Sequence, residues 1–272
     1  MGKRLTAIFF LAAVAVTVGI SVWGPEALSR YRDRSLLGRT HRQEVEEAGE
    51  GYRYELSAVE KIYVLSQALE SHLLSENRTL GTSAKETYQE TSGNYAFIMN
   101  HKGVSKESIS GEEAYGACNQ GLQALKDIGI LPESVQELNQ EQYDAVLCSA
   151  IDVREPRNYV AVWRLSLSEN TRGVRKENRL MDAYMDADDG KIYEFYARTQ
   201  WEWEEIDPDA IARAWCAYLG LPEPYAYEEV NPLMEATPYF RKYVVSGTSE
   251  ERTVMTVGFY EGIREFFVKV SW

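Results

Sequence analysis

Gly-Ile-Leu-Pro-Glu at residues 129–133 and Gly-Leu-Pro-Glu at residues 220–223 end two Ala-rich segments of the chain in the same way. Glycine closes a helix in the left-handed conformation, and a proline shortly afterwards prevents the helix from continuing. The pattern predicts helices at 112–129 and 208–219, the second opened by Asp207 with proline in its first turn. The shared ending indicates that the chain repeats a structural unit.

Strand patterns follow each of these two helices. Apolar and polar residues alternate, as in the segment where Tyr159, Ala161 and Trp163 share one side. The predicted strands cover residues 143–152, 159–168, 179–186 and 191–199, and then 239–246, 253–260 and 264–271. Because their connections are short, we expect antiparallel meanders. The predicted fold class is α+β, with two tandem helix-plus-antiparallel-sheet units at 95–200 and 201–272.

An apolar segment precedes these units. From Leu5 to Trp23 there are roughly 19 residues without a charge, close to the ~20 that span a hydrocarbon core. Lys3 and Arg4 come before it, and no small-x-small cleavage site follows it. We therefore predict a transmembrane signal-anchor helix at 1–24, with a cleaved signal peptide as the main alternative and a buried soluble helix as a weaker one.

The orientation of this segment depends on its flanks. Residues 25–54 form a predicted juxtamembrane stalk, and its first part, next to the apolar segment, carries Arg30, Arg32, Arg34, Arg39 and Arg42. A strict count of Lys and Arg favours a cytoplasmic domain, whereas a short positive N-terminus is typical of a signal-anchor, and long domains translocate despite nearby charge. We expect a single-pass protein of the cell membrane whose globular part is extracytoplasmic.

A helix is also predicted between the stalk and the first unit. Ser57 and Glu60 form a capping box that opens a helix through Glu76, within a helix-and-loop region at 55–94. Its apolar residues recur at helical spacing, which favours a helix packed on the domain over a self-associating stalk.

Charge is divided unequally along the chain. Residues 1–42 contain seven Lys/Arg and two Asp/Glu, a net of about +5; with −13 for the whole chain, residues 43–272 carry about −18. Phosphate contacts require cationic side chains, so this acidity argues against nucleic-acid partners. Three cysteines, Cys118, Cys148 and Cys216, are too few for a disulfide scaffold. We expect buried thiols, with a Cys118–Cys148 bridge as the alternative.

The segment Asp-Ala-Tyr-Met-Asp-Ala-Asp-Asp-Gly-Lys-Ile-Tyr at 182–193 resembles the strand-turn-strand signature of PepSY-type domains. The helix predicted before the sheet also agrees with that family, and the resemblance covers roughly 90 residues, or 170 with the second unit. It implies an extracytoplasmic, non-catalytic module of a bacterial membrane protein that binds or regulates peptidases or other envelope partners.

Four carboxylates near this turn raise the question of calcium: Asp186, Asp188, Asp189 and Glu194. A calcium loop needs ligands at alternate positions, but Asp188 and Asp189 are adjacent and the glycine comes one position early. We favour a tight hairpin turn and predict neither a metal nor another cofactor.

A possible ligand or partner surface is suggested by Trp201, Trp203, Glu204 and Glu205. Two indoles beside carboxylates suit a carbohydrate or a basic peptide. The alternative is a junction at which the indoles pack between the two units, while the carboxylates lie near a helix N-terminus.

The sequence contains no legible nucleophile, phosphate-loop or metalloprotease motif. The predicted function is a membrane-anchored, non-catalytic binding or regulatory module that engages another cell-envelope protein. An exposed edge strand, with the strand ending at Trp272 as candidate, can recruit an extended peptide. The alternatives are an envelope hydrolase or carbohydrate-binding protein, and a structural or assembly component of an envelope complex.

Overall fold

The computed structural model of the protein describes residues 54–79, 94–100, 108–168, 176–228, 239–247 and 251–271. All of them belong to one unit, Gly49–Trp272. The predicted anchor at 1–24 and the predicted stalk up to residue 53 lie outside the described residues. Within the described ranges, no helix is both long and apolar enough to cross a membrane.

The three helices predicted after the stalk are confirmed: α2 (Ala58–Thr79), α3 (Ala114–Asp127) and α4 (Pro208–Leu219). At the start of α2, Ser57 N donates to Glu60 Oε2 at 2.8 Å, and Glu60 N donates to Ser57 Oγ at 3.4 Å. The side chain of Asp207 caps α4. The two glycines that follow α3 and α4 have φ angles of 76° and 75°, the left-handed conformation that ends a helix.

Nine strands of the described residues make up the sheet, and seven of them were predicted to within two residues at each end. They are β1 (Tyr95–Met99), β2 (Tyr143–Asp152), β3 (Tyr159–Leu167), β4 (Arg179–Asp186), β5 (Ile192–Arg198), β6 (Tyr225–Ala226), β7 (Phe240–Ser246), β8 (Arg252–Tyr260) and β9 (Glu265–Ser271). The short edge strands β1 and β6 were not predicted. Two 3-10 turns, η1 (Trp203–Glu205) and η2 (Glu261–Ile263), lie before α4 and β9.

The prediction of two tandem units is wrong, because all nine strands form a single antiparallel sheet in the order β1-β2-β3-β4-β5-β9-β8-β7-β6. The two sets of strands meet where β5 pairs with β9, from Phe195 opposite Val268 to Arg198 opposite Glu265. Separate units would leave an unpaired strand edge on each side, and joining the edges satisfies their backbone groups. The strand that ends the chain is therefore interior, and the prediction that it is an edge strand is also wrong.

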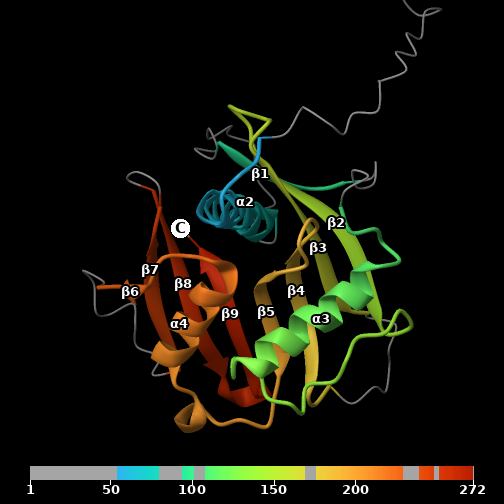
Figure 1. Ribbon diagram of the computed structural model, residues 1–272, viewed down its shortest axis with the longest axis vertical. Helices are drawn as coiled ribbons and strands as arrows, with labels where there is room; N and C mark the ends of the chain where they lie inside the picture. Colours follow the sequence, from blue (N-terminus) through green and yellow to red (C-terminus); the bar gives the residue numbers. More distant parts are fainter. Residues whose placement is uncertain are drawn as a thin grey trace, which may run out of the picture. The chain divides into compact units, whose positions relative to one another are not determined.

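The sheet separates two helical layers (Figure 1). Helices α3 and α4 pack on one face, where Trp163 Nε1 donates to Ile109 O at 2.9 Å and Tyr243 donates to Asp209 of α4. The opposite face carries α2, which contacts β1, β2 and β3 of one half of the sheet and β8 and β9 of the other. Helix α2 thus bridges the β5–β9 junction on that face.

The three cysteines are free and buried, as predicted. Burial raises the pKa of Cys118 and of Cys216 to about 12 and that of Cys148 to about 11. At neutral pH these thiols are protonated and behave as small apolar groups of the core.

Candidate binding surface

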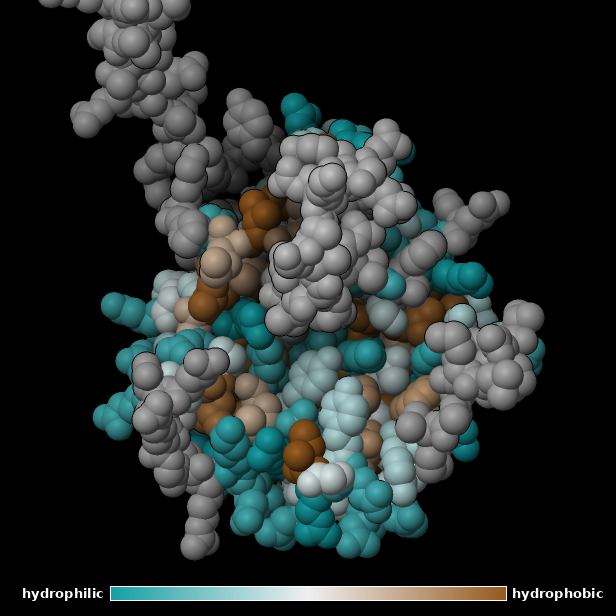
Figure 2. Space-filling model, turned by 180° about the vertical axis from the view of Figure 1, so that it is seen from behind, coloured by the Kyte–Doolittle hydropathy of each residue, from teal (hydrophilic) through white to brown (hydrophobic). Residues whose placement is uncertain are grey.

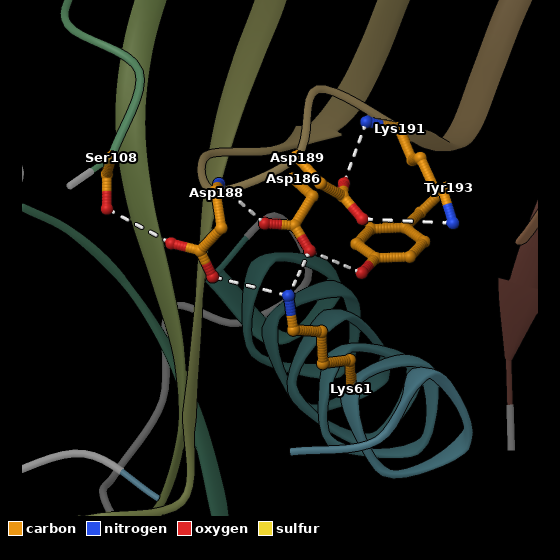
Figure 3. A network of polar contacts seen from close by, with 7 residues as sticks. All are labelled: Lys61, Ser108, Asp186, Asp188, Asp189, Lys191 and Tyr193. Atoms are coloured by element: carbon orange, nitrogen blue, oxygen red, sulfur yellow. Dashed lines mark hydrogen bonds and ion pairs between the residues drawn. The ribbon is translucent and has the colours of Figure 1, made fainter. Parts of the chain in front are cut away.

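The turn between β4 and β5 binds α2 through a buried polar network (Figure 3). Asp186, whose side chain is fully buried, accepts hydrogen bonds at Oδ2 from Lys61 Nζ and from Tyr193 Oη, each at 2.6 Å. Its Oδ1 accepts from Asp188 N at 2.8 Å, and Lys61 Nζ also lies 3.2 Å from Asp188 Oδ2. Burial by itself would lower the pKa of Lys61, but the hydrogen bond and negative charge of Asp186 raise it.

The network includes Asp186 and Asp188, two of the four carboxylates that raised the question of calcium. Lys61 pairs with Asp186 and Asp188, Asp189 lies 3.9 Å from Lys191 Nζ, and Glu194 accepts a hydrogen bond from Val270 N. In the part of the chain that the structure describes, no group of three His, Cys, Asp or Glu could hold a metal ion. Asp186 and Asp188 hold α2 in place on the sheet.

The four residues predicted as a ligand surface lie on and next to η1. Trp201 packs edge-on against Phe266, with ring centroids 5.6 Å apart, and Trp203 is also partly buried against the core. Glu204 and Glu205 are exposed, and Glu205 Oε2 accepts from Glu202 N at 2.9 Å in a local capping box. The junction alternative placed the indoles between two units, but in the single sheet they pack against its core. The binding role of these residues stays a prediction.

A different group of residues lies on the face that carries α2, on the part of the sheet away from that helix. Three rings are stacked there across β5, β9 and β8. The centroids of Tyr196 and Phe267 are 5.5 Å apart at 22°, and those of Phe267 and Tyr260 are 4.7 Å apart at 28°. Gly258 makes this possible, because a Cβ at that position would lie 2.3 Å from the ring of Phe267.

Ion pairs border the stacked rings on two sides. Arg164 Nη2 lies 2.8 Å from Asp182 Oδ2, and the guanidinium also lies over the ring of Tyr184 at 5.8 Å. Burial raises the pKa of Asp182, although Arg164 opposes the shift. Arg198 and Glu265 form the second pair, with Nε 3.5 Å from Oε2.

Glu194 lies beside the rings as a buried carboxylate, 6% exposed. Its Oε1 accepts from Tyr196 Oη at 3.2 Å, and its Oε2 accepts from Val270 N at 3.0 Å. Burial raises the pKa of Glu194 to about 7, against the opposing effects of these hydrogen bonds and of the charge of Lys269. A carboxylate that titrates near neutrality is a common feature of functional sites.

We call this group the aromatic–ionic surface. It comprises the partly or fully exposed Arg164, Asp182, Tyr196, Arg198, Tyr260, Glu265 and Lys269, and beneath them the buried Tyr184, Glu194 and Phe267. The lower half of Figure 2 shows this face as a mixture of hydrophilic and pale, weakly polar side chains with several hydrophobic groups between them. The sequence analysis did not select these residues. Their common signal, charged and aromatic side chains at alternate positions of adjacent strands, becomes visible once strand order and register are known.

A cavity of about 290 Å³ lies at the β6–β7 edge. Lys242 lies over the rings of Tyr227 and Phe240, at 5.5 and 5.7 Å. The carboxylate that lines the cavity, Asp209, accepts a hydrogen bond from Tyr243. Among the described residues that line the cavity, Asp209 is the one carboxylate, whereas a glycoside hydrolase uses two.

No protein-family model matches the chain, and comparisons with curated proteins and with solved structures also give no match. The β4–β5 hairpin is present with Gly190 in the left-handed conformation, at a φ of 73°. Its resemblance to PepSY-type domains stays a prediction.

Proposed function

We propose that the protein is a non-catalytic binding or regulatory module that engages another cell-envelope protein through the aromatic–ionic surface. In this proposal the N-terminal segment anchors the chain in the membrane and the sheet domain is extracytoplasmic. The resemblance of residues 182–193 to PepSY-type domains favours the same kind of role.

The stacked rings and neighbouring ion pairs are the observation that carries the proposal. Tyrosine, phenylalanine and arginine are enriched in the centres of protein–protein interfaces, where rigid rings bury area at little entropic cost. Tyr260 is 48% exposed and the Arg164 side chain is 42% exposed, so the described part of the domain leaves both accessible to a partner.

A protein fits this surface better than a polysaccharide does. Sugar rings stack on open aromatic faces, but both faces of Phe267 are occupied by Tyr196 and Tyr260. The partly exposed residues of the surface also include three cations (Arg164, Arg198 and Lys269) and two carboxylates (Asp182 and Glu265), within a chain of net charge −13. This balance lets a partner of either charge approach, and polar groups of both signs supply specificity.

Photo-crosslinking in intact cells tests the proposal. p-Benzoylphenylalanine in place of Tyr260 should give a discrete adduct with an envelope protein, and Arg164→Gln should weaken that adduct about fivefold, the effect of losing ~1 kcal/mol at an interface. The same crosslinker in place of Ile128 serves as the control, because this residue is 43% exposed at the end of α3, on the other face of the sheet. Equal adducts from both positions, or none from position 260, would overturn the proposal.

The location of the domain is tested separately, with a reporter that is active only outside the cytoplasm and is fused after Trp272. Activity supports an envelope partner. The opposite result is an inactive reporter, while a reporter that works only in the cytoplasm is active at the same position. It would mean that the arginine-rich flank sets the orientation, and the envelope proposal would fail.

A further inference from the structure

We propose that Glu194 controls the aromatic–ionic surface by proton uptake, which reverses its hydrogen bond with Tyr196 and frees the Tyr196 hydroxyl to donate to the partner. The inference rests on the proposed function in that the partner binds at this surface. The contact it predicts is with a hydrogen-bond acceptor of that protein, a backbone carbonyl or a carboxylate.

The position of Glu194 follows from the way β5 and β9 separate. The pairing of the two strands ends at Phe195 opposite Val268. The next N–H of β9 that points toward β5, that of Val270, therefore has no β5 carbonyl opposite it. The Glu194 carboxylate supplies the acceptor at Oε2, at 3.0 Å. Its other oxygen faces Tyr196 Oη at 3.2 Å, on the side of the stacked rings. The carboxyl group therefore joins the β5–β9 junction to the aromatic–ionic surface.

The groups around Glu194 set its titration. From β4 it faces Asp182 and Tyr184, from its own strand Tyr196, and from β9 Lys269. On β3, Arg164 is bound to Asp182, and on α2, Lys61 is bound to Asp186 and Asp188. Burial is the largest influence and raises the pKa to about 7, so a change of one pH unit around neutrality changes the charge of the group.

Protonation changes the direction of one hydrogen bond. In the ionised state both carboxylate oxygens accept, and the Tyr196 hydroxyl proton is committed to Glu194 Oε1. When a solvent proton is taken up on Oε1, that oxygen becomes the donor and Tyr196 Oη becomes the acceptor, while Oε2 continues to accept from Val270 N. The tyrosine proton must then turn away from Glu194, where a partner acceptor can receive it. Burial also raises the pKa of Tyr196, so its hydroxyl stays protonated throughout this range.

The first experiment uses the free, full-length protein labelled with ¹³C at glutamate Cδ and tyrosine Cζ. The glutamate resonance missing from Glu194→Gln should titrate with a midpoint near pH 7, and the tyrosine resonance missing from Tyr196→Phe should shift with the same midpoint. In Glu194→Gln, which imitates the protonated acid, the Tyr196 resonance should not titrate. A Glu194 midpoint near the ordinary value, or a Tyr196 resonance that does not follow it, overturns the inference.

The second experiment measures the adduct formed by p-benzoylphenylalanine at position 260, at pH 6 and pH 8. With a midpoint near pH 7, the protonated fraction of Glu194 falls about tenfold between pH 6 and pH 8. Apparent binding should therefore be about tenfold weaker at pH 8 than at pH 6. With the crosslinker at position 260, Glu194→Gln should form the adduct at both pH values as strongly as the protein with Glu194 does at pH 6. Tyr196→Phe should form it weakly and without pH dependence. An adduct that is independent of pH overturns the inference and leaves the proposed function standing. Absence of the adduct at both pH values refutes the proposed function, whereas the NMR titration still decides the hydrogen-bond reversal.

Discussion

Gly258 shows how a single residue determines the shape of the aromatic–ionic surface. An added Cβ would lie 2.3 Å from Cζ of Phe267, and that ring is held between Tyr196 and Tyr260. Because the ring cannot move without disturbing both stacks, Gly258→Ala should lower the free energy of unfolding by about 1–3 kcal/mol, the usual cost of overpacking. Urea unfolding of the purified protein measures the change.

Gly262→Ala is the matched control for this substitution. A Cβ at Gly262, in η2, meets no atom within 4 Å, so its effect should stay within about 0.5 kcal/mol. Equal stability of the two variants would contradict the stacking argument.

Glu194 makes a second prediction at the residue scale. Its pKa rises from the ordinary 4.5 to about 7 on folding, so the folded protein binds this proton more tightly than the unfolded chain does. Stability contributed by the protonated acid is therefore fully present below pH 4.5 and is lost as the pH rises to about 7. Glu194→Gln lacks this loss, so its free energy of unfolding at pH 8 should exceed that of wild type by on the order of 3 kcal/mol. Near pH 4 the two proteins should not differ. Denaturant unfolding as a function of pH measures both proteins, and a constant difference between them would refute the shift.

At the scale of the element, α2 depends on Lys61 to pair with a buried charge. Asp186 is fully buried, and the lysine lies 2.6 Å away across 125 residues of sequence. Lys61→Met keeps the apolar stem but leaves the aspartate without its cation. We therefore expect the free energy of unfolding to fall by about 3–5 kcal/mol. Loss of hydrogen-exchange protection should be greatest in α2 and at the β4–β5 turn.

Two further variants separate the ion pair from general damage to the helix. Lys191→Met removes a lysine whose Nζ is 3.9 Å from Asp189 Oδ2, with both side chains more than a third exposed, and should cost less than about 0.5 kcal/mol. Lys61→Met combined with Asp186→Asn should recover part of the lost stability. A double variant as unstable as the sum of its parts would show that the pair itself contributes little.

At the scale of the whole molecule, the β5–β9 junction makes the two halves of the sheet one cooperative unit. Phe266 is fully buried at the junction, with its ring centroid 5.7 Å from that of Phe195 on β5. Phe266→Ala should cost about 3–5 kcal/mol, and amide exchange should accelerate equally in β3 and in β8. Independent halves would instead show acceleration in β7–β9 while β2–β4 kept their protection. Ile263→Ala, at a residue 46% exposed, should leave both halves unchanged.

Local chemistry explains why most elements could be predicted. Capping by Ser57 and Asp207 and the left-handed glycines after α3 and α4 act within a few residues, and each was legible in the chain. The short strands β1 and β6 were missed because two to five residues carry too little periodicity. Their place in the sheet comes from pairing with β2 and β7.

The sequence by itself determined the helices, the alternating strands, the buried cysteines and the acidity of the chain. Tertiary structure decided that two similar helix-and-strand sets share one sheet, because β5 and β9 satisfy each other's backbone groups across the chain. It also decided which carboxylates are structural and which lie at the candidate surface: Asp186 is bound by Lys61 from a distant helix, and Glu194 by Val270 from a distant strand. Such pairings depend on strand order and register, which are set by packing between residues far apart in sequence and leave no local pattern.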